Sequence, residues 1–281
     1  MPQPQDTSTT DPRIDALVAD AERALEQDDT ASLLKLCADI LALEPAYSKA
    51  HMLMARSMMP GLNYLQILTR THQLLHPATY IEIGVATGKS MQRARAETLA
   101  LGVDPEPRIK HEIGCRARLY PMTSDDFFER FDLHQELGQQ SPDLCFIDGL
   151  HLFEQTLRDF VNLERYSSTE TVALIHDCYP PTELSAARER AMPYWAGDVW
   201  KVIPSLRKFR PDLKVSVVPA MPSGLAVITG LNASSRILED EFDEIVSWAK
   251  QLQYAELAQN REQLLNVVAN DWSVIQGLLT D

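Results

Sequence analysis

Seven short apolar runs divide residues 78–230, and this alternation constrains the fold more than any other feature of the sequence. Most of the runs are nearly continuous in Val, Ile, Leu and Ala, and segments of helical periodicity separate several of them. Strands with this composition are buried on both faces, as in a parallel sheet covered by helices on each side. The predicted strands are 79–85, 99–104, 116–122, 143–149, 171–177, 214–219 and 224–229. We therefore predict an α/β fold with a doubly wound, mostly parallel seven-stranded sheet.

The connections between these runs predict where the sheet departs from a simple parallel order. Segments 89–100, 123–131 and 153–166 are predicted to be helices. The last two runs follow one another closely and predict a hairpin, which gives the sheet an antiparallel edge. Residues 178–203 form an insertion rich in proline and aromatic residues, and they are either a lid over a bound molecule or a packed surface loop.

Helical segments flank the predicted sheet on both sides. After a tail at 1–11 that we expect to be disordered, region 12–77 has helical periodicity throughout. Segment 33–59 resembles one tetratricopeptide helix pair, with Pro45 in the turn, but no second copy follows at the period of about 34 residues. We therefore expect these helices to pack on the next domain or on a second subunit. Region 231–281 is also predicted to be helical and to pack on the core or at a homodimer interface.

Composition narrows the class of partner and the compartment. A formal net charge of −14 disfavours nucleic acid as a partner, because its phosphates would be repelled. No apolar run approaches the roughly 18 residues of a membrane span, so no membrane partner is expected. The four cysteines show no CxxC spacing, which favours neither a zinc site nor a disulfide framework. A reducing cytoplasm is the expected location.

The stretch YIEIGVATGKS (80–90) predicts a strand that ends in a ligand-binding loop. A phosphate-binding P-loop needs four residues between its two glycines, whereas three separate Gly84 from Gly88. Glu82 would also place a negative charge close to a polyphosphate. A dinucleotide fingerprint would have glycine where Ala86 stands. The stretch therefore favours a ligand without phosphates, although an NAD- or ATP-binding protein stays open as an alternative.

Polar residues follow the next four strands in positions suited to ligand chemistry. Asp104 ends the second strand, 22 residues after Glu82, where a carboxylate commonly binds a ribose. Neighbouring parallel strands lie under about 5 Å apart, so side chains at their ends converge. The candidates after the third, fourth and fifth strands are Ser124 and Asp125, Asp148 and His151, and His176 and Asp177. The last four residues predict a divalent-cation site or a metal-free acid–base pair.

The order E-x-G-x-x-x-G after the first strand resembles class I S-adenosyl-L-methionine-dependent methyltransferases, which have a Rossmann-like fold. The stretches IDGLH (147–151) and HDCYP (176–180) are similar to the small-molecule and sugar O-methyltransferase branch, and the similarity spans roughly 78–230. The resemblance implies that S-adenosylmethionine is bound by residues of the first three strand ends. These are Glu82, Gly84, Gly88, Ser90, Asp104, Ser124 and Asp125.

The resemblance also implies catalytic roles at the fourth and fifth strands. Asp148 and Asp177, with His176 beside them, would hold Mg²⁺, and His151 would take the proton from a substrate hydroxyl. Leu150 and Cys178 stand where some relatives have further ligands, so metal dependence is left open. We expect O-methylation of a small molecule or glycan. The alternatives are an NAD- or ATP-binding Rossmann-like enzyme and a non-catalytic helical scaffold that binds a protein partner.

Overall fold

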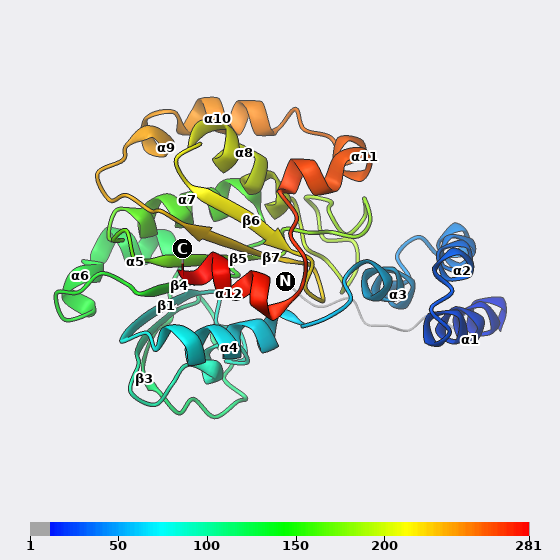
Figure 1. The fold of residues 1–281 in the computed structure, drawn as a ribbon, viewed down its shortest axis with the longest axis horizontal. Coiled ribbons are helices and arrows are strands. Elements are labelled where there is room, and N and C mark those ends of the chain that lie inside the picture. The colour runs from blue at the N-terminus through cyan, green and yellow to red at the C-terminus, as the bar shows by residue number, and fades with distance from the viewer. Residues whose placement is uncertain (1–11, 281) are drawn as a thin grey trace.

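The computed structural model describes residues 12–280, so the tail predicted for 1–11 lies outside the described residues. The strands are β1 (Thr79–Ile83), β2 (Leu99–Val103), β3 (Arg116–Tyr120), β4 (Leu144–Ile147), β5 (Val172–His176), β6 (Lys214–Val218) and β7 (Leu225–Thr229). They form one seven-stranded sheet in the order β3-β2-β1-β4-β5-β7-β6 (Figure 1). The prediction of a doubly wound, mostly parallel sheet is confirmed.

β7 runs antiparallel to both of its neighbours, β5 and β6. The predicted hairpin of the last two strands is therefore present. The strand that runs antiparallel to the others is β7, and β6 rather than β7 forms the edge of the sheet. Strand order reverses between β1 and β4, which pair in parallel from Tyr80 to Ile83. Ligands of such sheets bind beyond the carboxyl ends of the strands at this reversal.

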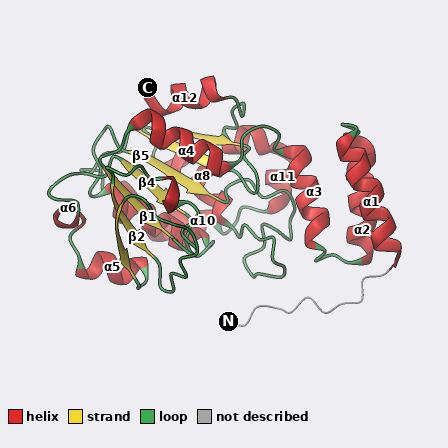
Figure 2. Ribbon diagram, turned by 90° about the horizontal axis from the view of Figure 1, so that it is seen from below, coloured by secondary structure: helices red, strands yellow, loops and turns green. Residues whose placement is uncertain are grey.

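Helices cover both faces of the sheet, as Figures 1 and 2 show. Alternate residues of β1 point to opposite faces, so Tyr80 packs with one cluster and Ile81 with the other. The first face is covered by α4 (Tyr64–Leu75) and α12 (Trp272–Thr280). The second face is covered by α5 (Ser124–Arg130), α6 (Leu133–Glu136), α7 (Phe153–Glu164), α8 (Val202–Phe209), α9 (Ile237–Asp240), α10 (Phe242–Ala249) and α11 (Tyr254–Leu265).

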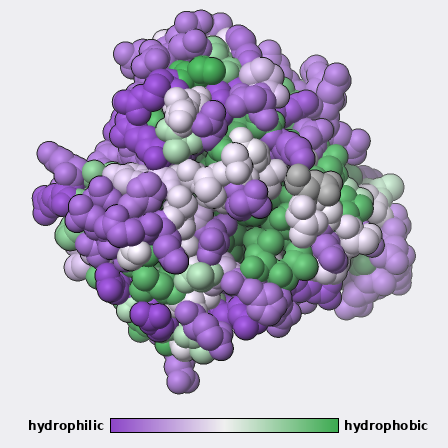
Figure 3. Space-filling model, turned by 60° about the vertical axis from the view of Figure 1, so that its left-hand side comes forward, coloured by the Kyte–Doolittle hydropathy of each residue, from purple (hydrophilic) through white to green (hydrophobic). Residues whose placement is uncertain are grey.

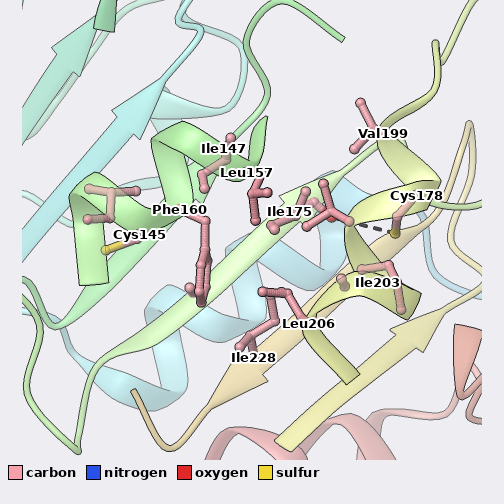
Figure 4. Close-up of a cluster of buried hydrophobic side chains, with 14 of the residues drawn as sticks. Cys145, Ile147, Leu157, Phe160, Ile175, Cys178, Val199, Ile203, Leu206 and Ile228 are labelled. Atoms are coloured by element: carbon pink, nitrogen blue, oxygen red, sulfur yellow. Dashed lines mark hydrogen bonds between the residues drawn. The ribbon is translucent and has the colours of Figure 1, made fainter. Parts of the chain in front are cut away.

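The second face carries the larger core. Figure 4 shows Ile147 and Ile175 of the sheet beside Leu157 and Phe160 of α7 and Leu206 of α8. All five side chains are at most 1% exposed, so this packing fixes α7 against the ends of β4 and β5. On the outside, hydrophilic residues cover most of the face seen in Figure 3, and hydrophobic residues gather in a few patches. Within residues 12–280, no helix combines the length and the apolarity that a membrane span requires.

The first three helices form a unit at one end of the molecule (Figures 1 and 2). They are α1 (Pro12–Glu26), α2 (Thr30–Leu43) and α3 (Ser48–Met58), and Pro45 lies in the turn between α2 and α3. This unit has a hydrophobic cluster of its own, which includes Ile14, Leu33 and Leu53. Only the last part of α3 joins the main core, through Ala55 and then Met59.

The helix predicted for 89–100 is wrong. One short 3₁₀ turn, η1 (Met91–Arg93), is followed by loop, and β2 already begins at Leu99. The tertiary contacts explain the difference, because the Leu99 amide donates to the Ala78 carbonyl at 2.9 Å and the Thr98 hydroxyl donates to the Pro77 carbonyl at 2.7 Å. These bonds hold the start of β2 against the start of β1, so the residues from Leu99 onward pair in the sheet and do not continue a helix.

Candidate active site

One cavity of about 620 Å³ lies beyond the carboxyl ends of β1 to β5. It occupies the place where the strand order reverses, as expected for a doubly wound sheet. Nine of the eleven predicted site residues line it: Gly84, Ser90, Asp104, Ser124, Asp125, Asp148, His151, His176 and Asp177. Glu82 and Gly88 do not line it. The structure therefore brings the predicted cofactor residues and the predicted catalytic residues to one cavity.

Gly84 allows the ends of β1 and β4 to meet. Its φ of +91° is in the region that favours glycine, and a Cβ added there would lie 2.0 Å from the carbonyl oxygen of Asp148. No other residue type fits so close an approach without moving one of the strands. This contact sets the cofactor loop directly beside the predicted catalytic carboxylate.

Glu82 lies behind the cavity wall rather than in it. Its carboxylate is fully buried and accepts hydrogen bonds from the Tyr80 hydroxyl at 2.7 Å and from the hydroxyl of Ser90. Burial raises the pKa of Glu82 to about 8, although both hydrogen bonds oppose the shift. Ser90, which lines the cavity, thus separates Glu82 from it. The sequence motif predicts that Glu82 and Ser90 belong to this strand and loop, but it does not predict which of the two side chains lines the cavity.

Asp104 forms hydrogen bonds that stabilise the loop after β1. Its Oδ2 accepts from the Ala86 amide and its Oδ1 accepts from the Glu106 amide, both at 2.7 Å. Ala86 has a φ of +46°, an uncommon value for a residue with a side chain, and the Asp104 bond stabilises it there. The Arg108 amide then donates to the Ala86 carbonyl at 2.8 Å. Asp104 is therefore a cavity carboxylate and the main support of the β1 loop.

The β3 end carries a polar network that sequence reasoning found only in part. Ser124 donates to Oδ1 of Asp159 at 2.6 Å, and Gln155 donates to Oδ1 of Asp125 and of Asp159, both at 3.1 Å. Burial raises the pKa of Asp159 to about 7. Gln155 and Asp159 lie one turn apart on α7 and were not predicted. The signal available in the sequence was their i, i+4 spacing, which puts an amide and an acid on one face of the predicted helix 153–166.

The β4 and β5 ends converge as predicted. Nδ1 of His176 lies 3.1 Å from Oδ1 of Asp148, and Nε2 of His151 lies 3.1 Å from Oδ2 of Asp177. His151 Nε2 is also 3.6 Å from Asp148. The Ser223 hydroxyl donates to Oδ1 of Asp177. Two carboxylates and two imidazoles thus form one cluster at the wall of the cavity.

The charges of this cluster depend on each other. Burial alone would lower the pKa values of His151 and His176, but the charges of Asp177 and Asp148 outweigh it and raise them to about 9 and about 10. Burial would raise the pKa of Asp148, but the two imidazoles hold it below its usual range. At neutral pH both imidazole rings are therefore doubly protonated and positively charged. His151 can accept a proton only after the negative charge beside it is neutralised by something else.

The donor set fits a divalent cation. One ligand atom each from Asp148, His151 and Asp177 lie within 4.8 Å of one another. Oδ2 of Asp177 is buried and has no hydrogen-bond partner, although His151 lies near it. The predicted ligand set contained His176 in place of His151. The His176 ring is stacked on Tyr64 with centroids 4.1 Å apart, and its Nδ1 faces the same two carboxylates.

The insertion forms the wall opposite the sheet. Tyr194 and Trp195 line the cavity, whereas Tyr179 and Trp200 are buried. The Trp195 ring stacks on His151 with centroids 5.2 Å apart and an interplanar angle of 17°, and its carbonyl accepts from Nδ1 of His151 at 3.2 Å. A carbonyl can only accept, so Nδ1 carries a proton in this bond, and Nε2 is the nitrogen that lies near Asp148 and Asp177. The insertion is therefore packed at Tyr179 and Trp200 and lines the cavity at Tyr194 and Trp195, and its role as a lid stays a prediction.

Comparison with known proteins identifies the central segment. Residues 81–178 match a methyltransferase domain. The match runs from the middle of β1 to just past the end of β5 and so includes every predicted site residue. It confirms the resemblance to the methyltransferases over these residues. No curated protein sequence matches the chain.

Three solved structures are similar to this chain at low sequence identity. A candidate O-methyltransferase from Klebsiella pneumoniae has 16% identity and a TM-score of 0.46, over 80% of this chain and 92% of that one. The O-methyltransferase TomG from Streptomyces achromogenes, of tomaymycin synthesis and in complex with S-adenosylmethionine, has 12% identity and a TM-score of 0.48, over 70% and 96%. An O-methyltransferase from Bacillus cereus in complex with S-adenosylhomocysteine has 13% identity and a TM-score of 0.45, over 77% of this chain and 99% of that one.

Proposed function

We propose that the protein is an S-adenosylmethionine-dependent O-methyltransferase that acts on a hydroxyl of a small molecule or glycan. The observation that carries the proposal is the single cavity that extends from Gly84, Asp104 and Ser124 to Asp148 and His151. A methyl donor at the first group and an acceptor at the second would share one enclosed space. The methyltransferase domain match over 81–178 supports the same conclusion.

The charge of the cavity favours this cofactor over NAD or ATP. Among the described residues, the lining contains five aspartates, one lysine (Lys89) and the two protonated histidines, and these histidines lie beside Asp148 and Asp177 at the β4 and β5 ends. Such a lining repels polyphosphates and attracts a sulfonium cation. We propose that Asp104 binds the ribose, that Ser124 and Asp125 contact the adenine edge, and that Ser90 contacts the amino-acid tail. Glu82 would then act through Ser90, and Gly88 through the conformation of the loop.

The proposed reaction is an in-line displacement. The acceptor oxygen attacks the methyl carbon, a C–O bond forms as the C–S bond breaks, and S-adenosylhomocysteine leaves. The proton of the hydroxyl passes to Nε2 of His151, because Nδ1–H is held by the Trp195 carbonyl. A divalent cation, when bound by Asp148 and Asp177, would supply positive charge that lowers the pKa of both the acceptor hydroxyl and His151. Tyr194 and Trp195 would orient the acceptor.

A calorimetric titration tests the cofactor. We expect micromolar binding of S-adenosylhomocysteine and no detectable binding of ATP or NAD at the same concentrations. Binding of a phosphate-bearing nucleotide instead would favour the Rossmann-like alternative, and binding of none of the three would favour the helical scaffold. Loss of methyl transfer in EDTA and its recovery with added Mg²⁺ would support the metal role, whereas full activity in EDTA would remove it. A homodimer and a cytoplasmic location stay predictions.

A further inference from the structure

We propose that helix α3 of the N-terminal unit positions the loop of His151, and that Thr182 is the positioning residue through which it acts. The proposal rests on the proposed function, in which His151 accepts a proton. It gives the N-terminal unit a role in the active site, although α1 to α3 lie at the far end of the molecule from most of the sheet (Figures 1 and 2).

The first contact joins α3 to the insertion. His51 of α3 is 2% exposed, and its Nε2 lies 2.8 Å from the Pro45 carbonyl while its Nδ1 lies 2.8 Å from the Thr182 hydroxyl. A carbonyl can only accept, so Nε2 carries the proton and Nδ1 accepts from Thr182. Burial lowers the pKa of His51, which keeps this neutral form. The bond from Nε2 to Pro45 thus fixes the His51 ring, and Nδ1 then holds the Thr182 hydroxyl.

The second contact links Thr182 to the chain beside the cavity. The Ser185 amide donates to the Thr182 hydroxyl oxygen at 3.2 Å, and the Ser185 hydroxyl donates to the Thr182 carbonyl at 2.8 Å. Ser185 is fully buried, and its own carbonyl accepts from the amides of Ala196 and Gly197 at 2.9 and 3.1 Å. The turn at 182–185 therefore fixes the backbone at 196–197.

The third contact is with His151 itself. A Cβ on Gly197 would lie 1.9 Å from the His151 carbonyl oxygen, so the two backbones touch. Trp195, immediately before this pair, stacks on the His151 ring and accepts from its Nδ1. Asp198, immediately after it, accepts from the Phe153 amide at 2.8 Å. Three consecutive elements of the insertion thus hold the His151 loop, which has a φ of +58° at His151.

The insertion has a second anchor at its start, which makes the α3 contact testable on its own. The Tyr254 hydroxyl of α11 donates to the Pro181 carbonyl at 2.7 Å, and Arg261 donates to the Pro180 carbonyl. These bonds hold 180–181 without help from His51. Loss of the Thr182 hydroxyl should therefore loosen 182–197 without releasing the whole insertion.

Substitution of Thr182 separates the positioning role from a general loss of fold. Thr182→Val keeps the size of the side chain and removes its hydroxyl, whereas Thr182→Ser keeps the hydroxyl. Lys49→Ala, which removes an exposed ion pair with Glu22 at 2.9 Å on the same helical unit, is the matched control. For each variant of the full chain we would measure amide hydrogen exchange at 195–197, kcat, KM and the affinity for S-adenosylhomocysteine.

We expect Thr182→Val to exchange the Ala196 and Gly197 amides at least about tenfold faster, because their common acceptor is no longer fixed. Its kcat should fall about tenfold, with the affinity for S-adenosylhomocysteine within about twofold. Thr182→Ser and Lys49→Ala should match the wild type in all four measurements. Unchanged exchange in Thr182→Val would overturn the proposal, as would an equal loss in Thr182→Ser. If the wild type transfers no methyl group, the proposed function fails, while the exchange result still decides whether the Thr182 hydroxyl, which contacts both His51 of α3 and the Ser185 amide, fixes 195–197.

Discussion

The two halves of the cavity are built in different ways. The proposed cofactor half follows β1, β2 and β3. Its loops after β1 and β2 are held by contacts close in sequence: Ser90 bonds Glu82 eight residues away, and Asp104 bonds Ala86 eighteen residues away. Its β3 end reaches farther, from Ser124 to Asp159 across 35 residues. The proposed catalytic half follows β4 and β5, and its contacts with other segments are distant. His151 bonds Trp195 across 44 residues, and Ser223 bonds Asp177 across 46.

This difference indicates which parts of a site a sequence motif can predict. A loop after a strand, with its own hydrogen bonds, can be read from a few consecutive residues. A site completed by an insertion and by flanking helices cannot, because each part contributes one or two residues far apart in the chain. We therefore expect mutations in the cofactor half to change affinity and those in the catalytic half to change turnover.

The largest effect should come from His151→Ala in the catalytic half. We expect kcat to fall about 10²- to 10⁴-fold, because the variant loses the proposed acceptor of the hydroxyl proton. The affinity for S-adenosylhomocysteine should stay within about twofold. His111→Ala, outside the cavity lining, is the control and should be neutral. A variant at position 151 with normal turnover would exclude the base assignment.

Gly84→Ala tests the point where the two halves touch. A Cβ 2.0 Å from the Asp148 carbonyl must push β1 and β4 apart, so both affinity and stability should fall. We expect at least about a tenfold loss of affinity for S-adenosylhomocysteine and a loss of about 2–4 kcal/mol in the free energy of unfolding.

Gly138→Ala is the matched control for backbone strain. Gly138 has a φ of +69°, but a Cβ there meets no atom within 4 Å. It should cost only about 1 kcal/mol and leave affinity unchanged. Equal losses of affinity and stability in the two variants would show that strain, and not the contact with Asp148, accounts for the effect of Gly84→Ala.

Asp104→Asn should affect the cofactor half alone. The amide keeps one acceptor for the two backbone N–H groups and loses the negative charge, so we expect about a tenfold weaker affinity for S-adenosylhomocysteine. At saturating cofactor, kcat should stay within about twofold. Asp143→Asn is the control, since Asp143 accepts from the Ala78 and Thr79 amides at the opposite end of the strands. A weaker affinity in the control would point to a general loss of fold.

Glu82→Gln should have the smallest effect of these variants, and we expect it to change the stability of the fold. The folded protein binds the Glu82 proton more tightly than the unfolded chain does, because its pKa is raised to about 8. Ionisation of Glu82 therefore destabilises the fold progressively as pH rises from about 4.5 to about 8. Glutamine cannot ionise, so the variant does not lose this stability as pH rises.

Thermal melts of the ligand-free protein measure this effect. The variant should melt about 3–6 °C above the wild type at pH 8 and close to it at pH 5. Glu97→Gln, with a side chain 77% exposed, should show no such pH dependence. A difference that is the same at both pH values would mean that folding does not raise the pKa of Glu82.

Most of the fold could be predicted from the sequence, because strands buried on both faces have a distinctive composition. The prediction failed at 89–100, where helical periodicity was overruled by the pairing of β2 with β1. Among the site residues, Asp104, Asp148 and Asp177 were found because each follows a strand. Asp159 and Gln155 were missed because they reach the cavity from the middle of α7.

The sequence alone determined the seven strands, their mostly parallel arrangement and which residues stand at their carboxyl ends. Local composition and period set these features, and no distant contact is needed to read them. Tertiary structure decided that Ser90 and not Glu82 faces the cavity, that His151 joins Asp148 and Asp177, and that the Trp195 carbonyl contacts Nδ1 of His151. Each of these depends on which side chains become buried together when distant segments pack, and no single segment contains that information.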